Sequence, residues 1–430
     1  MKLLNQDKNN IKSCLKEANN FIILTTGRAG TDFLQSCFDN HLEVASTSEK
    51  TISLPNFIED NKYLLPSSSD VFAALVVKEL FFSFAPFNNE MEDWGISKKD
   101  NYRKANVNSF IECLNYIFSF EENYTNSLQI TRSIILAFGF SIGKDISNIK
   151  SILIHLHHIN KLSFYADNLE KRDLIVVCSR NPFDMVASGV FHWQKYWNNL
   201  NFYDYSVRLG HYRFVFKRTI YDSLDVKKNI VLSRPKIYLS MLEKLSNINY
   251  LNNINKHLSI EAFKEFPRSS VLGIDRGGDL LSSNSKNKVK GSYDVSLVDR
   301  GSPLKRLGFV ESVLLTLTCR ERIIFYNLNT KDNLLEKLLK INNLFRVLLF
   351  FLLLPIPSKI ELIYYKNVLN QFIKIFSCDK LSSKKKYKQI LFSTYYFILY
   401  PSEYFYIRIL KIKSLFLNLN SPQFIIELDH

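Results

Sequence analysis

The stretch FIILTTGRAGTDFLQSCF, residues 21–38, decides how this chain is expected to fold. Its first four residues are apolar and rich in β-branched side chains, which is typical of a buried strand. A loop follows in which Gly27 and Gly30 stand on either side of a cation, Arg28. From Asp32 onward, apolar residues recur at helical spacing. Such a turn exposes backbone N–H groups beside the positive end of a helix dipole, which favours binding of phosphate or sulfate.

The loop taken alone leaves other interpretations open. An ordinary connection between a strand and a helix can also carry a GxxGT sequence, because short motifs match by chance. A nucleotide-kinase loop fits less well, since the Walker A pattern is G-x-x-x-x-G-K-[ST]. Here two residues separate the glycines, and Thr31 stands where the lysine should be. The loop therefore has the composition of an anion site without the usual groups for ATP and magnesium.

A second motif, LIVVCSRNPFDMVASG, occupies residues 174–189. Its continuous apolar start predicts a central strand of a parallel sheet. Asn181 is an expected N-cap, followed by a proline and, in the first turn, by Asp184, so a helix should begin just after Arg180. Ser188 lies four residues beyond Asp184 and therefore faces the same side of that helix.

Together the two motifs resemble those of sulfotransferases that use 3′-phosphoadenosine 5′-phosphosulfate (PAPS), in particular the bacterial, carbohydrate-directed branch. The second matches the family's 3′-phosphate pattern, R-[DN]-P-x-D-x-x-x-S, at every fixed position. The resemblance implies an α/β fold with a P-loop-type parallel sheet flanked by helices. It also implies that Arg28 stabilises charge on the bridging oxygen, with no metal required. The implied PAPS-binding residues are Thr26, Gly27, Arg28, Ala29, Gly30, Thr31, Asp32, Arg180 and Ser188.

Two residues are candidates for the base that removes the acceptor's proton. His155 ends an apolar strand and lies 25 residues before Arg180, an interval similar to that of the base histidine in cytosolic sulfotransferases. Glu49 resembles a glutamate that acts as base in the tyrosylprotein branch. The structural alternatives are that His155 is a hydrogen-bonded histidine at a strand end and that Glu49 is a solvated loop carboxylate. His155 and His157 share one strand face, but no third ligand accompanies them, so no metal site is expected.

We expect one α/β domain over residues 18–300, with a helical insertion at about 60–145, and a helical, basic, aromatic-rich C-terminal region over 310–430. Six scattered cysteines and an N-terminus without an apolar segment favour a cytoplasmic protein. Tyrosines and lysines beside apolar residues at 384–419 indicate either contact with the inner face of a membrane or a helical appendage packed on the core. Residues 300–430 carry 20 lysines and arginines against 9 acidic residues, a balance of +11 within a total of +15. An anionic membrane surface or an acidic glycan explains this charge, and no motif indicates nucleic acid.

The expected function is transfer of a sulfuryl group from PAPS to a hydroxyl or amine of a glycan or glycolipid acceptor. A P-loop kinase of small molecules and a catalytically silent glycan-binding protein on the same scaffold are the alternatives. Ser283 and Gly291 weakly resemble the family's late segment over the nucleotide. Lys305 and Arg306 are interpreted as surface cations.

Overall fold

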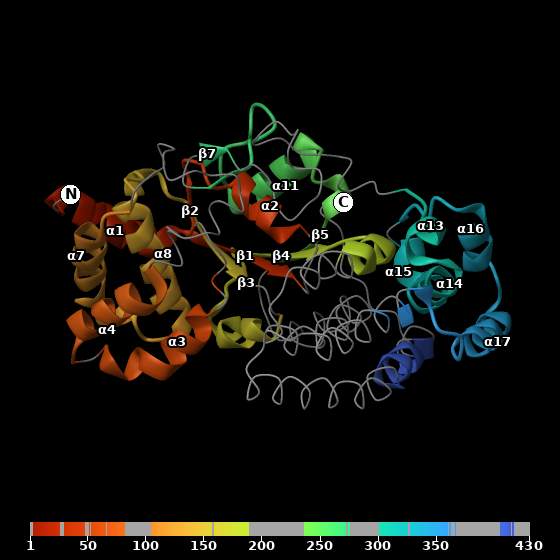
Figure 1. Cartoon of the computed structure of the whole chain (residues 1–430). Coiled ribbons are helices and arrows are strands. Elements are labelled where there is room, and N and C mark those ends of the chain that lie inside the picture. The colour runs from red at the N-terminus through yellow and green to blue at the C-terminus, as the bar shows by residue number, and fades with distance from the viewer. Residues whose placement is uncertain are drawn as a thin grey trace, which may run out of the picture. The chain divides into compact units, whose positions relative to one another are not determined.

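The structure is a computed structural model in which the chain forms two compact units (Figure 1). The first contains Met1–Ser179, Asp225–Val295 and Ile425–His430, and the second contains Arg180–Leu224 and Ser296–Phe424. The structure describes residues 3–25, 30–47, 51, 53–65, 67–81, 105–156, 159–188, 236–271, 274–275, 301–325, 327–359, 361–362, 366, 405–413 and 415–416.

The first unit is built on a five-stranded parallel sheet in the order β2-β3-β1-β4-β5. The central strand, β1, is buried from Asn20 to Thr25, and β3 and β4 on its two sides are buried along their whole length. Strands covered on both faces are continuously apolar, which is why the runs at 21–24 and 174–178 could be predicted as central strands. The five strands are β1 (Asn19–Thr25), β2 (Val44–Ala45), β3 (Ser151–Leu156), β4 (Leu174–Ser179) and β5 (Lys236–Met241).

Helices flank this sheet, as expected for an α/β protein, and the segment at about 60–145 is helical where the structure describes it. Within it, α8 contacts β2 and β3, and α3 and α7 pack on α8. The helices of the unit are α1 (Asn5–Glu17), α2 (Thr31–Cys37), α3 (Leu54–Asn61), α4 (Ser69–Val76) with a π-helical continuation (Val77–Phe81), α7 (Val107–Phe118), α8 (Ser127–Ser141) and α11 (Ile248–Leu258). A short antiparallel pair, β6 (Ser270–Val271) and β7 (Ile274–Asp275), accompanies them.

One buried carboxylate, that of Asp173, links the first residues of β1 and β4 through hydrogen bonds. Asp173, just before β4, accepts hydrogen bonds from the backbone N–H and the side-chain amide of Asn20, at 2.8 and 2.9 Å. It also accepts the backbone N–H of Glu170 at 2.7 Å. These bonds help to hold Phe21 opposite Leu174, the register that the two strands share. The two strands that carry the sequence motifs are thereby aligned.

In the second unit, the regular secondary structure of the described residues consists of helices. A short helix at 182–188 begins it, and a further helix spans residues 405–413. Phe183 and Val186 of the first helix share one buried apolar cluster with Leu314, Phe350 and Leu410. Among the helices in the described part of the chain, none is long and apolar enough to cross a bilayer. The remaining helices are α13 (Pro303–Leu307), α14 (Phe309–Thr318), α15 (Arg320–Phe325), α16 (Asn333–Leu339) and α17 (Asn343–Leu353).

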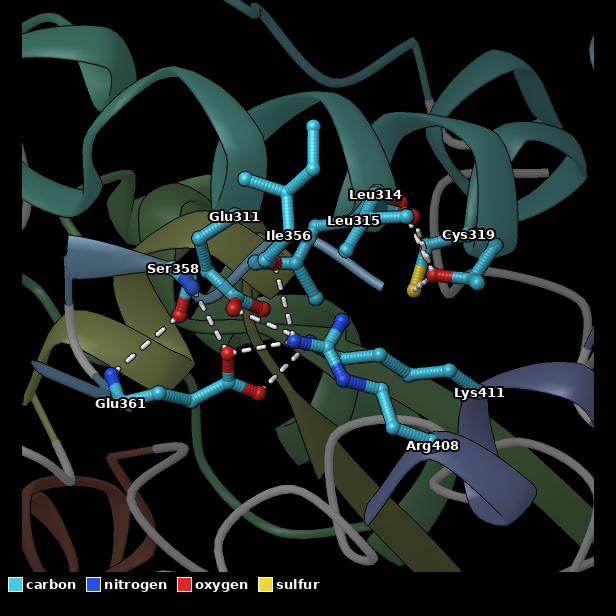
Figure 2. Close-up of polar contacts among 10 residues, drawn as sticks. Glu311, Leu314, Leu315, Cys319, Ile356, Ser358, Glu361, Arg408 and Lys411 are labelled. Atoms are coloured by element: carbon cyan, nitrogen blue, oxygen red, sulfur yellow. Dashed lines mark hydrogen bonds and ion pairs between the residues drawn. The ribbon is translucent and has the colours of Figure 1, made fainter. Parts of the chain in front are cut away.

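A group of buried charged side chains forms ion pairs and hydrogen bonds in the interior of this second unit (Figure 2). Lys411 and Glu311 are fully buried, and the Lys411 Nζ lies 3.0 Å from the Glu311 Oε2. Beside them the Arg408 Nη2 donates to the Glu361 Oε2 at 2.6 Å. That same carboxylate oxygen accepts the backbone N–H of Ser358 at 2.7 Å. Burial raises the pKa of Glu361, whereas Lys411 and Arg408 act to lower it.

Candidate functional site

In each of the two sequence motifs, the segment after the strand begins at the carboxyl end of one of two neighbouring strands, β1 and β4. β1 ends at Thr25, whose partner on β4 is Cys178, and β4 ends one residue later at Ser179. The strand that follows β1 in sequence, β2, lies on one side of it, and the strand that follows β4, β5, lies on the other. Open α/β sheets bind their ligands at such a divergence, outside the carboxyl ends of the strands. The glycine loop begins after Thr25, and Arg180 is the next residue after Ser179.

The end of the glycine loop has a backbone conformation that favours glycine. Gly30 has φ of +83° and forms the N-cap of α2, where its carbonyl accepts the Leu34 N–H at 3.0 Å. A Cβ at this position would lie 2.3 Å from the Leu242 Cδ1. The predicted helix after the loop is confirmed and begins at Thr31, one residue ahead of Asp32. Residues Thr26, Gly27, Arg28 and Ala29 lie outside the described residues.

Replacing Gly30 by alanine should destabilise the protein more than replacing Gly143. Both glycines have positive φ, near +80°, so each alanine would cost roughly 1–2 kcal/mol of backbone strain. A Cβ at Gly143 meets nothing within 4 Å, whereas one at Gly30 must also displace the buried Leu242. Urea unfolding of both variants measures the difference. Equal losses in the free energy of unfolding would show that the Leu242 side chain moves aside at little cost. Backbone strain alone would then account for a glycine at position 30.

His155 is fixed by a hydrogen-bonded chain that runs from β3 to α2. Its side chain is fully buried, and its Nδ1 lies 2.6 Å from the Gln35 Oε1. The Gln35 amide donates its Nε2–H to the Thr47 carbonyl at 2.7 Å, which leaves the amide oxygen facing the ring. In the neutral imidazole, Nδ1–H is therefore the donor, and Nε2 carries the lone pair. Asp32 contributes a carboxylate oxygen 3.9 Å from the same Nδ1.

This arrangement fixes the tautomer of the ring, because the bond to Gln35 places the proton on Nδ1 and the lone pair on Nε2. Gln35 was not singled out from the sequence. The available signal was its position three residues after Asp32, which places both on one face of α2. Because the His155 ring is buried, its role as base stays a prediction and requires that the acceptor reach Nε2. Glu49 lies outside the described residues.

In the second unit, the backbone of the second sequence motif is held as its sequence predicts. The Asn181 Oδ1 accepts the Phe183 N–H at 3.1 Å, so Asn181 is the N-cap of the helix at 182–188. Arg180 and Ser188 are both buried. The Arg180 carbonyl accepts a hydrogen bond from the Arg322 Nη2 at 2.7 Å. Their assignment to a 3′-phosphate is not tested by these contacts and stays a prediction.

The interpretation of Arg306 as a surface cation is wrong. Its Nη2 lies 2.6 Å from the Asp184 Oδ1, and only 17% of the Arg306 side chain is exposed. The same nitrogen donates to the Gly301 carbonyl at 3.1 Å. The neighbouring Lys305 is exposed, as expected. Asp184, a fixed position of the motif, therefore serves to attach the motif helix to α13.

Other predicted positions, His157, Ser283 and Gly291, also lie outside the described residues. Within the described ranges, no group of three or more histidine, cysteine, aspartate or glutamate side chains could hold a metal ion. Comparison of the chain with models of protein families, with characterised proteins and with solved structures found no match.

Proposed function

We propose that this chain is a sulfotransferase that moves a sulfuryl group from PAPS to a hydroxyl or amine of an acceptor, with a glycan as the acceptor class. One observation carries the proposal: two strands adjacent in the sheet, β1 and β4, each end where a phosphate-type motif begins. The strand order, with the glycine-loop strand in the centre, also supports a P-loop-type sheet. On this proposal the C-terminal residues 310–430 form an appendage to the catalytic fold.

The proposed roles divide between the cofactor and the acceptor. The loop at 26–31 binds the 5′-phosphosulfate, and Arg28 stabilises the negative charge that develops on the bridging oxygen. Arg180 and Ser188 bind the 3′-phosphate, the group that distinguishes PAPS from ATP. As the acceptor oxygen bonds to sulfur and the bridging S–O bond breaks, a base takes the acceptor's proton. His155 is proposed for that step through Nε2, with Glu49 as the second candidate.

Titration calorimetry with adenosine 3′,5′-bisphosphate tests the cofactor assignment. We expect it to bind far more tightly than AMP or ADP. Arg180→Ala should abolish that preference, because a charge-assisted contact to phosphate contributes roughly 1.5–3 kcal/mol, or about 10- to 150-fold in affinity. Lys171→Ala, which removes an exposed cation from the turn before β4, is the matched control and should bind as the unmodified protein does.

The same experiments separate the alternatives. Equal affinity of the unmodified protein for ADP and adenosine 3′,5′-bisphosphate would contradict the sulfotransferase proposal. Phosphorylation of a small molecule that depends on ATP would indicate the kinase alternative. Binding of adenosine 3′,5′-bisphosphate without transfer to any tested glycan, lipid or peptide would favour a catalytically silent binding protein. Folding of Arg180→Ala must be checked by circular dichroism, since Arg180 is buried.

A further inference from the structure

Helix α17 is apolar on two opposite sides. Its inward side packs in the second unit through Phe350 and Leu353, next to the buried Arg346. At 3.6 residues per turn, its exposed apolar residues also fall on one side, about 120° wide and away from the packed side. This exposed stripe, called here the α17 stripe, includes two side chains that are 70% exposed, and its members are Leu344, Phe345, Leu348, Phe351 and Leu352.

The helix at 405–413 in the same unit repeats this arrangement. Ile407 and Leu410 pack into the apolar cluster that holds Phe350. On the other side of the helix, Phe405 and Ile409 are exposed one turn apart. Both helices therefore bury one apolar side and expose a second. Surface apolar residues that gather in contiguous stripes, rather than singly, mark interaction surfaces.

The charges of the second unit indicate what kind of partner surface it can bind. Four acidic residues are paired with cations inside the unit: Glu311 with Lys411, Glu361 with Arg408, Glu321 with Arg346, and Asp184 with Arg306. With these acids buried or paired, the exposed charges in the described part of the unit are mostly positive. Within the part of the unit that the structure describes, Glu336 is the one exposed acidic residue, against seven exposed lysines at 305, 331, 337, 340, 359, 366 and 413.

We propose that the second unit docks on an anionic lipid surface, with the α17 stripe lying in the interface and the exposed lysines facing the headgroups. Apolar side chains flanked by lysines bind such surfaces through combined apolar burial and electrostatic attraction. A second copy of this chain fits less well, because it would bring the same excess of positive charge to the interface. Helix α17 has 11 residues, about half of the roughly 20 that span a bilayer, so it lies on the membrane.

This proposal does not depend on the sulfotransferase assignment, and flotation of the full chain with vesicles tests it. We expect the protein to float with phosphatidylglycerol-containing vesicles, to float weakly with pure phosphatidylcholine, and to be released by high salt. Phe345→Ser and Leu348→Ser should each weaken binding roughly tenfold, since each removes a side chain from the stripe. Lys337→Glu and Lys340→Glu should each weaken it roughly fivefold or more.

Leu42→Ser is the matched control, because Leu42 belongs to the first unit and is as exposed as Leu344. It should float as the unmodified protein does, and all the substituted side chains are exposed, so folding should be retained. Failure to float with anionic vesicles, or an equal loss in the control, would overturn the proposal. A dimer that is detected by light scattering and dissociated by Phe345→Ser would also overturn the proposal, since the α17 stripe would then bind a second copy of the chain.

Discussion

Replacing Lys411 by methionine should lower the free energy of unfolding by roughly 3–5 kcal/mol. The Lys411 Nζ lies 3.0 Å from the Glu311 Oε2, and both side chains are fully buried. Removal of one partner leaves a carboxylate in a low-dielectric interior, and the cost of desolvating that charge is no longer offset. Methionine preserves most of the side-chain volume, so the loss should report the charge rather than a cavity. Urea unfolding of the unmodified and variant proteins measures it.

Lys413→Met is the matched control, because Lys413 belongs to the same helix but is exposed. Its effect should stay within about 0.5 kcal/mol. The double variant Lys411→Met/Glu311→Leu should recover much of the lost stability, since a buried ion pair can be replaced by apolar residues at little cost. A loss below about 1 kcal/mol for Lys411→Met would show that Glu311 reaches water or another cation.

The pH dependence of the same variant gives a second test. Burial holds the pKa of Glu361 above its ordinary value of 4.5, and Lys411 opposes that rise. Without Lys411 the pKa of Glu361 should rise further, so the folded state binds a proton more readily than the unfolded state does. Lowering the pH from 7 towards 4.5 should therefore favour folding of the variant relative to the unmodified protein. The stability difference should shrink at acid pH, and a constant difference would contradict this account.

Local sequence was sufficient to predict the elements whose signal is local. The runs at 21–24 and 174–178 have no polar interruption, which is typical of strands buried on both faces. Asn181 predicted a helix start because capping depends on residues within one turn. By contrast, β2 consists only of Val44 and Ala45, too few residues to show any period. The strand order depends on pairings between residues far apart in sequence and could not be predicted from these patterns.

The contacts that shape the candidate site join residues far apart in the sequence. Gln35 meets His155 across 120 positions, and its spacing from Asp32 indicates a shared helix face but does not indicate the histidine. Lys305 and Arg306 are adjacent cations that looked equivalent, but only Arg306 reaches the Asp184 carboxylate. The basic balance of the C-terminal region was visible from the sequence. Which acids are neutralised internally, and hence how basic the surface is, required the three-dimensional arrangement.

If the proposed function is right, His155→Asn should lower sulfuryl transfer by roughly a hundredfold or more, while leaving the affinity for adenosine 3′,5′-bisphosphate nearly unchanged. Asparagine is chosen because its side-chain amide nitrogen lies near the position of Nδ1 and can donate to the Gln35 Oε1, as the ring does now. The substitution therefore keeps the contact with α2 and removes only Nε2, the proposed proton acceptor. Alanine would remove both and leave a cavity in a buried site.

Two control variants and a stability measurement decide what an observed loss of turnover means. Gln35→Leu removes the acceptor of the Nδ1–H and should change the pH profile of turnover as well as its rate, because the ring could then exchange tautomers. Glu49→Gln should have a mild effect if His155 is the base. A large loss in Glu49→Gln with full activity in His155→Asn would reverse the assignment. If His155→Asn retains turnover but loses stability, the buried ring joins β3 to α2 and has no catalytic role.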